Sequence, residues 1–176
     1  MEQSQVISQT IRSSEGERRV YFIAFLAALS ISLAIVEHMV PRPLPWMRFG
    51  LANAITLYAF GVLRPKEVLL LVIARVVASS LLIGSFLSVT FLLSLSGALS
   101  SFFVMLSLFL LFRRFFSLIG ISVAGALTSN AVQLLVVNTL FINSRISYYL
   151  LPLILLFALG GGIVSGLFGR FLTEHI

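Results

Sequence analysis

The chain has 176 residues, of which 59% are hydrophobic and 10% are charged, with a net charge of +6. Because a soluble domain carries about 25% charged residues, this composition excludes an ordinary soluble protein and predicts an integral membrane protein. The basic residues lie mostly in short connections between apolar runs, which indicates control of membrane topology and not binding of nucleic acid. The absence of cysteine excludes disulfides, thiolate metal sites and thiol nucleophiles.

Six apolar segments predict an all-α bundle of six transmembrane helices. A membrane span needs about 20 residues, and the second segment reaches that length only if its helix begins near Pro45. The boundary between the third and fourth segments, near Gly84 and Ser85, carries no charge. The expected segments are residues 20–39, 49–63, 67–83, 86–112, 116–141 and 147–172.

The distribution of Lys and Arg predicts that both termini face the cytoplasm. We therefore expect a cytoplasmic N-terminal segment (1–19), a six-helix transmembrane domain (20–172) whose first helix is retained, and a short tail (173–176). The expected location is the cell (inner, cytoplasmic) membrane, with the chain crossing the lipid bilayer several times. This orientation places Arg12, Arg18, Arg19, Arg64, Lys66, Arg113, Arg114 and Arg170 inside and only Arg42, Arg48 and Arg145 outside.

The first outer connection, VEHMVPRPLPWMRFGLAN, is polar and holds three prolines at alternate positions. We interpret Glu37, His38, Arg42 and Trp46 as residues of a gating loop over a pocket, and Arg48 as a candidate ligand contact. Trp46 is equally typical of an anchor at the membrane surface. His38 is more typical of a solvated loop residue than of a metal ligand, because few His or carboxylate partners lie nearby. No metal site is expected.

Arg75 lies near the middle of the third segment, in LLLVIARVVASS. A charged residue at that depth costs about 2.5–3.5 kcal/mol on insertion scales, so it needs a partner or a water-filled cavity. Two interpretations follow. Arg75 either forms a structural ion pair, for example with Glu37, or binds the charge of a ligand. We favour the ligand, because the chain offers few acids.

Three amide side chains, Asn53, Asn130 and Gln133, fall in the outer halves of the second and fifth segments. Asn130 and Gln133 are three residues apart and share a helix face, and Asn138 follows close to the same face. Such amides often make interhelical hydrogen bonds worth about 0.6 kcal/mol, and this alternative stays open for each of them. Taken together with Arg75, they predict a pocket that opens to the outside. The excess of arginine favours an anionic ligand.

Small residues form stripes on the first and last segments. Ala24, Ala28 and Ser32 are spaced four apart, so they lie on one helix face that either packs within the chain or docks a partner protein. The run GGGIVSGLFG near the C-terminus has the same spacing, and we expect it to pack within the chain.

These features together resemble an S component, the substrate-capturing membrane subunit of energy-coupling factor (ECF) transporters. The resemblance rests on the size, the six short spans, the Ala24-x-x-x-Ala28 pair and the polar loop after the first helix. It implies a pocket near the outer surface, gated by that loop. It also implies that Ala24 and Ala28 face a transmembrane T component, with two cytoplasmic ATPases supplying energy.

The chain has a closer resemblance to the family labelled Gx transporter or heptaprenyl diphosphate synthase component I. The segments that carry it are PRPLPWMRFGLANAITLYA, the stretch around Arg75, SLSGALSS, IGISVAGALTSNAVQ and the final Gly-rich segment. The resemblance implies a His-Asn pair where this chain has Ser129 and Asn130.

A catalytic role in prenyl diphosphate synthesis conflicts with the composition. Mg²⁺ and diphosphate need carboxylate ligands, and the sequence has no Asp and no Walker A motif. We therefore expect no enzyme, no catalytic residue and no cofactor. The expected function is an S component that captures a small anionic or amphipathic nutrient, such as a vitamin or an isoprenoid phosphate. The alternative is a non-catalytic membrane accessory subunit of an isoprenoid or quinone pathway, or of a larger membrane complex.

Overall fold

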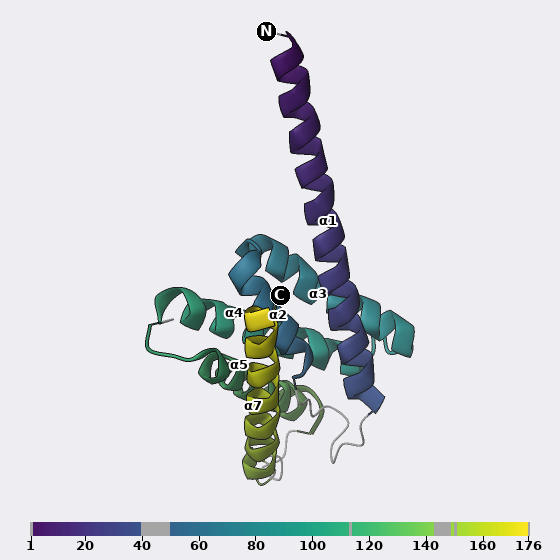
Figure 1. The fold of residues 1–176 in the computed structure, drawn as a ribbon. Coiled ribbons are helices and arrows are strands. Elements are labelled where there is room, and N and C mark those ends of the chain that lie inside the picture. Colours follow the sequence, from purple (N-terminus) through teal and green to yellow (C-terminus); the bar gives the residue numbers. More distant parts are fainter. Residues whose placement is uncertain (1, 40–49, 113, 143–148, 150, 176) are drawn as a thin grey trace.

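The computed structural model describes residues 2–39, 50–112, 114–142, 149 and 151–175, and every regular element in these ranges is a helix (Figure 1). The predicted all-α class is therefore confirmed. In chain order the elements are α1 (Glu2–Met39), α2 (Ala52–Val62), α3 (Pro65–Ile83), α4 (Val89–Leu111), α5 (Leu118–Val137), the π-helix η1 (Asn138–Ile142) and α7 (Leu151–His175).

Four helical stretches in the described ranges are long and apolar enough to cross a membrane. Helix α3, with 19 residues, rises about 28 Å, close to the hydrocarbon thickness of about 30 Å. Helix α2 has 11 residues and crosses only about half that depth. The helices agree with the six expected segments, and the chain is a multi-pass membrane protein. The four stretches are Gly16–Met39, Val89–Leu111, Leu118–Leu140 and Leu151–Glu174.

Helix α2 is shorter than predicted because the chain is not helical at Gly50. Gly50 has a φ of 80°, in the left-handed region that interrupts an α-helix, and α2 begins two residues later at Ala52. The second segment therefore does not reach the length of a span as one uninterrupted helix, which was the condition stated for it. Pro45 itself lies outside the described residues.

Helix α1 extends much further towards the N-terminus than the apolar segment that predicted it. It begins at Glu2, so most of the polar stretch 1–19 is helical and continuous with the first span. Figure 1 shows this N-terminal part projecting beyond the other helices. The stretch is rich in Glu, Gln and Arg and has no proline, which favours continuation of the helix.

The uncharged boundary between the third and fourth segments falls where it was predicted. Helix α3 ends at Gly84, which has a φ of 74°, and the backbone N–H of Ser85 donates to the carbonyl of Ser80 at 2.8 Å. This is the usual way for a left-handed glycine to end a helix. Helix α4 then begins after Ser88, whose hydroxyl accepts a hydrogen bond from the N–H of Phe91 at 3.3 Å.

Glycines on α7 let that helix lie directly against α5. A Cβ atom added to Gly162 would sit 2.7 Å from the Cα of Val123, and one added to Gly166 would sit 2.6 Å from the Cα of Ile119. Neither position has room for a larger residue unless the backbones move apart. The prediction that the Gly-rich last segment packs within the chain is confirmed.

Large apolar side chains lie on the outside of the bundle as well as in its core. Such an apolar exterior suits contact with lipid, since a soluble protein of this size rarely exposes so much. Exposed examples are Phe25, Leu70, Leu82, Phe103, Leu110, Leu156 and Phe171, whereas Ile55, Val68, Met105 and Ile121 are fully buried in the core.

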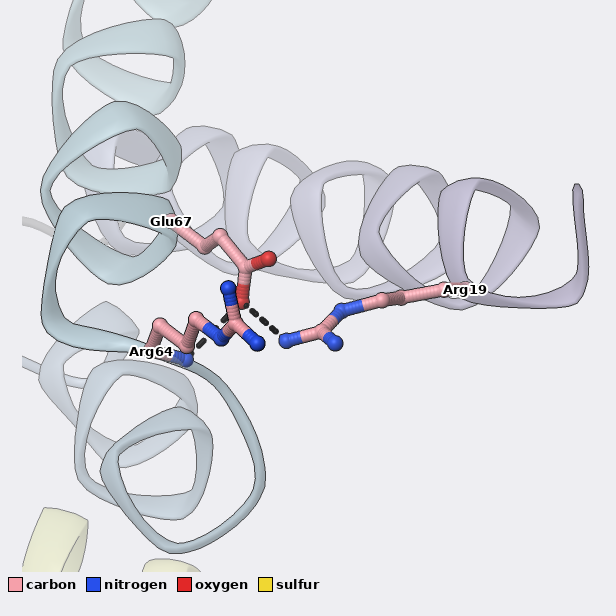
Figure 2. Close-up of polar contacts among 3 residues, drawn as sticks. All are labelled: Arg19, Arg64 and Glu67. Atoms are coloured by element: carbon pink, nitrogen blue, oxygen red, sulfur yellow. Dashed lines mark hydrogen bonds and ion pairs between the residues drawn. The ribbon is translucent and has the colours of Figure 1, made fainter. Parts of the chain in front are cut away.

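A charged group at one end of the bundle ties α1 to the start of α3 (Figure 2). The carboxylate oxygen Oε2 of Glu67 accepts a hydrogen bond from Arg19 Nη2 at 2.9 Å and another from the backbone N–H of Arg64 at 2.8 Å. The second bond caps the first turn of α3, where an acidic residue also complements the helix dipole. This group fixes where α1 lies relative to the turn between α2 and α3.

Candidate ligand-binding site

A small polar cavity lies where five helices converge. Its volume is about 20 Å³, enough for about one water molecule. Three of the side chains predicted to bind a ligand, Arg75, Asn53 and Asn130, lie at this cavity, together with the gating candidate Glu37. Among the described residues, the lining is Ala34 and Glu37 from α1, Gly50 just before α2, Ala52 and Asn53 from α2, Arg75 from α3, Ser94 and Ala98 from α4, and Ala126, Ser129 and Asn130 from α5.

Arg75 is the buried cation of the site. It is 5% exposed, and its Nη1 donates to the hydroxyl of Thr56 on α2 at 3.4 Å. The guanidinium carries five N–H donors in a planar fork, so it can bind several acceptors at once. A buried arginine that also lines a cavity is placed to bind an anionic group in that cavity.

Glu37, near the end of α1, is the buried anion of the site and is also 5% exposed. Its Oε1 accepts a hydrogen bond from the backbone N–H of Gly50 at 2.8 Å, and the hydroxyl of Ser165 on α7 donates to the Gly50 carbonyl at 2.7 Å. Gly50 is therefore held to α1 through its N–H and to α7 through its carbonyl. These bonds fix the backbone at the point where the chain enters the wall of the cavity.

Hydrogen bonds orient the two cavity asparagines. Asn53 Nδ2 donates to the hydroxyl of Ser101 on α4 at 3.3 Å, and Asn130 Nδ2 donates to the carbonyl of Ala126 at 3.0 Å, one turn back on its own helix. An amide side chain has two donors and a carbonyl acceptor, so it can bind several partners at once. These two residues supply the amide groups of the described wall.

Gln133 does not line the cavity, although it is only three residues from Asn130. It lies between α4 and α5, where a Cβ added to Gly97 would come within 2.3 Å of its Nε2. Its Nε2 donates to Ser129 at 3.2 Å, and its Oε1 is buried without a partner among the described residues. The absence of a side chain at Gly97 brings α4 against this part of α5, so Gln133 packs between helices.

The remaining predicted residues fall into two groups. Arg48, Arg42 and Trp46 lie outside the described residues, so their predicted roles stay predictions. His38 is exposed near the end of α1 and does not line the cavity.

The stripe of small residues on α1 faces outwards. Ala24, Ala28 and Ser32 are all exposed, and the hydroxyl of Ser32 donates to the carbonyl of Ala28 within the helix. Within the described part of the chain, this face is therefore not packed against another helix.

Several serines and Gly50 belong to the site but were not predicted. Ser94, Gly97, Ala98 and Ser101 on α4 are spaced at i, i+3, i+4 and i+7, so they form one small, polar face on a helix that is otherwise strongly apolar. That spacing was readable in SLSGALSS. Ser165 and Gly50, by contrast, are 115 residues apart, and no local pattern indicates their contact.

The donor set suits a small polar ligand better than a metal ion. The described wall of the cavity offers one guanidinium, one carboxylate, two amides and two hydroxyls. Among the described residues, no three His, Asp or Glu side chains gather in one place. The arrangement can bind by charge and by hydrogen bonds.

Fold and site together define a multi-pass helical membrane protein with a polar cavity inside its bundle. The family model for heptaprenyl diphosphate synthase component I matches residues 26–172, and the chain belongs to that family. The comparisons with curated proteins and with solved structures gave no match. The family's description names one component of a synthase, and the matched residues include every helix that lines the cavity.

Proposed function

We propose that this chain is the substrate-binding S component of an ECF-type transporter, capturing a small anionic or amphipathic molecule from outside the cell. A vitamin or an isoprenoid phosphate has the required chemistry. The observation that carries the proposal is the convergence of Glu37, Asn53, Arg75 and Asn130, from four different helices, on one enclosed cavity.

The energetic argument concerns the buried charges. A charged side chain inside a membrane costs several kcal/mol unless it is paired or faces water, and such residues usually mark a ligand or ion pathway. Thr56 and Gly50 are the hydrogen-bond partners described above for Arg75 and Glu37, and both charged side chains also face the cavity. A ligand whose charged group binds there offsets the cost of burying them.

The cavity has a volume of only about 20 Å³, so capture of a nutrient requires the helices around it to move apart. The outer connection expected to gate the pocket joins α1 after Glu37 and ends at Gly50. Opening on this side would break the hydrogen bonds that Gly50 makes with Glu37 and Ser165.

The energising partners in this proposal are a transmembrane T component and two cytoplasmic ATPases. The exposed stripe of Ala24, Ala28 and Ser32 supports docking on α1, because small residues let another helix approach closely. Replacing Ala24 and Ala28 by Leu should abolish copurification of these partners. Ala74→Leu, at an exposed alanine on α3, is the matched control and should leave the assembly intact.

The second candidate function is a non-catalytic accessory subunit of an isoprenoid or quinone pathway, favoured by the family's description. Under either function the chain itself is not an enzyme, since it has no Asp to hold Mg²⁺ and diphosphate. Copurification separates the two candidates. A T component with ATPases supports the first, and a soluble prenyl diphosphate synthase subunit supports the second.

Capture from outside can be tested with a single introduced cysteine, because the chain has none of its own. Ser129→Cys places a thiol in the cavity wall, and Ser117→Cys places one on the exposed N-cap of α5, at the other end of that helix. A membrane-impermeant thiosulfonate reagent added to intact cells should label Cys at position 129 slowly. It should label Cys at position 117 only after the cells are permeabilised.

The opposite result, in which position 117 reacts in intact cells and position 129 only in permeabilised ones, would overturn capture from outside. If the thiol at position 129 does not react with reagent from either side while the protein remains folded, the proposal that the cavity opens would be contradicted.

A further inference from the structure

The described wall of the cavity holds one acidic and one basic side chain, and this combination of charges narrows the class of ligand. The sequence alone favoured an anion because arginines outnumber acids in the outer half. In the described wall of the cavity, however, there is one arginine, Arg75, and one glutamate, Glu37, with the amides of Asn53 and Asn130 also in the wall. We propose that the captured molecule is a small zwitterion, whose anionic group binds Arg75 and whose ammonium group binds Glu37. This inference rests on the function proposed above.

A ligand with only an anionic group fits this wall poorly. Its charge would gain from Arg75 but would be repelled by the Glu37 carboxylate in the same enclosed space, where screening by water is weak. A ligand with only a cationic group meets the reverse problem at Arg75. A molecule that carries both charges gives each of the two buried residues an oppositely charged partner. These partners replace any water that the two side chains lose when the ligand binds.

Both charged groups have the chemistry to bind a ligand. Gly50 donates to Oε1 of Glu37, and a carboxylate has about four acceptor positions on its two oxygens. Arg75 donates from Nη1 to Thr56, and a guanidinium has five N–H donors in a planar fork. An amide side chain both donates and accepts, so Asn53 and Asn130 suit the polar middle of such a ligand.

Glu37 also links ligand charge to the backbone that closes the cavity. The carboxylate that would bind the ammonium group is the one that holds the N–H of Gly50. A bound ammonium would polarise and strengthen this arrangement, so a zwitterion would favour the closed state more than an anion would. The charge at Glu37 therefore acts in recognition and in closure.

Glu37→Gln separates the charge of this residue from its structural bond, because the Gln carbonyl still accepts from the N–H of Gly50. The probes are two matched series of molecules. One contains γ-aminobutyrate, butyrate and propylamine, and the other contains para-aminomethylbenzoate, para-methylbenzoate and para-methylbenzylamine. Binding is measured as the shift in melting temperature of the full chain in lipid nanodiscs.

In the wild-type protein the zwitterion of at least one series should bind about tenfold more tightly than the acid or the amine on the same skeleton. Glu37→Gln should remove the preference over the acid, and Arg75→Gln should remove the preference over the amine. Ser122→Ala, at a fully buried serine outside the cavity, is the control and should change neither of these two binding preferences.

Equal binding of acid and zwitterion by the wild-type protein, unchanged in Glu37→Gln, would overturn the zwitterion and leave capture of an anion standing. If no probe binds, recognition by this charge pair is overturned, while the cysteine-labelling experiment still judges capture separately. Glu37 and Arg75 could instead serve only to neutralise each other. The double variant with both changes should then regain wild-type stability, and the wild-type protein should show no preference for the zwitterion. That result would also overturn the inference.

Discussion

Two groups of glutamate and arginine lie near opposite ends of the membrane part of α1, and their surroundings differ. Arg19 and Glu67 form an ion pair whose side chains are 44% and 26% exposed (Figure 2). Glu37, 18 residues or about 27 Å further along α1, and Arg75 on α3 are both 5% exposed and line a cavity. The first pair is open to solvent or lipid headgroups, and the second group is enclosed.

The difference indicates which charges are candidates for binding. An exposed ion pair contributes about 0–1 kcal/mol, so the pair of Arg19 and Glu67 positions α1 without adding much stability. Buried charges cost several kcal/mol each, and a hydrophobic replacement is often as stable. Glu37 and Arg75 are therefore poor choices for stability alone, and their position at a cavity favours a role in binding.

The largest expected effect comes from removing the buried cation. Arg75→Gln should weaken binding of the molecule that the wild-type protein captures by about a hundredfold, because losing one partner of a buried, hydrogen-bonded charge pair costs about 2–5 kcal/mol. Arg19→Gln, at the exposed pair, should change binding less than about twofold. Titration in nanodiscs measures both. Arg75→Lys, which keeps the charge but not the planar fork, should fall between them.

A folded Arg75→Gln protein that binds as tightly as the wild type would contradict the claim that the buried charges bind the ligand and the exposed pair does not. So would an equal loss of binding in Arg19→Gln.

The next effect concerns the glycine that Glu37 holds. Gly50→Ala should lower the free energy of unfolding by about 1–2 kcal/mol, because a φ of 80° strains any residue with a Cβ atom. The added Cβ would also lie 3.2 Å from Asn53 Nδ2. Gly61→Ala is the matched control, since its Cβ would meet nothing within 4 Å and should be neutral or stabilising. Thermal unfolding in detergent compares them, and equal melting temperatures for the two variants would contradict the account of Gly50.

A smaller effect is expected at Ser165. Removing its hydroxyl by Ser165→Ala deletes the hydrogen bond to the Gly50 carbonyl and should cost about 0.5–1.5 kcal/mol of stability. Ser107→Ala removes an exposed hydroxyl that donates to its own helix, and it should change stability by less than about 0.5 kcal/mol. Hydrogen exchange at Gly50 should rise in Ser165→Ala alone. Unchanged exchange there would mean that α7 does not help to hold this backbone.

The smallest effect belongs to the exposed pair. Glu67→Gln keeps an acceptor for the N–H of Arg64 but removes the exposed ion pair with Arg19, so it should lower stability only slightly. The difference from the wild type should shrink further in high salt, which screens exposed charges. A loss of several kcal/mol that persists in high salt would show that this pair is as important as the enclosed one.

The sequence predicted the helices well because their signals are local. Long apolar runs separated by charges or by Gly84 need no tertiary information, and the six expected segments match the observed helices within a few residues at most ends. The starts of the first and second helices differ from the predicted ones. The polar residues before Arg18 continue α1, since nothing in them stops a helix. The second helix starts late because Gly50 has a left-handed backbone conformation. The sequence does not reveal whether a single glycine adopts a positive φ.

The site was predicted in part, for a related reason. Arg75, Asn53 and Asn130 stood out because polar groups are rare in apolar helices, and all three line the cavity. Gln133 satisfied the same rule but packs against Gly97, because helix–helix distance depends on the facing residue. The contacts among Glu37, Gly50 and Ser165 join distant parts of the chain, so only the structure places them together.

The most direct test of ligand capture is native mass spectrometry of the gently purified protein, comparing the wild type with Arg75→Gln and Arg19→Gln. The wild type and Arg19→Gln should each carry one small molecule, released on activation, that Arg75→Gln lacks. A wild-type protein that is empty or carries only lipid after purification from several hosts, or an equal adduct on all three proteins, would contradict the account.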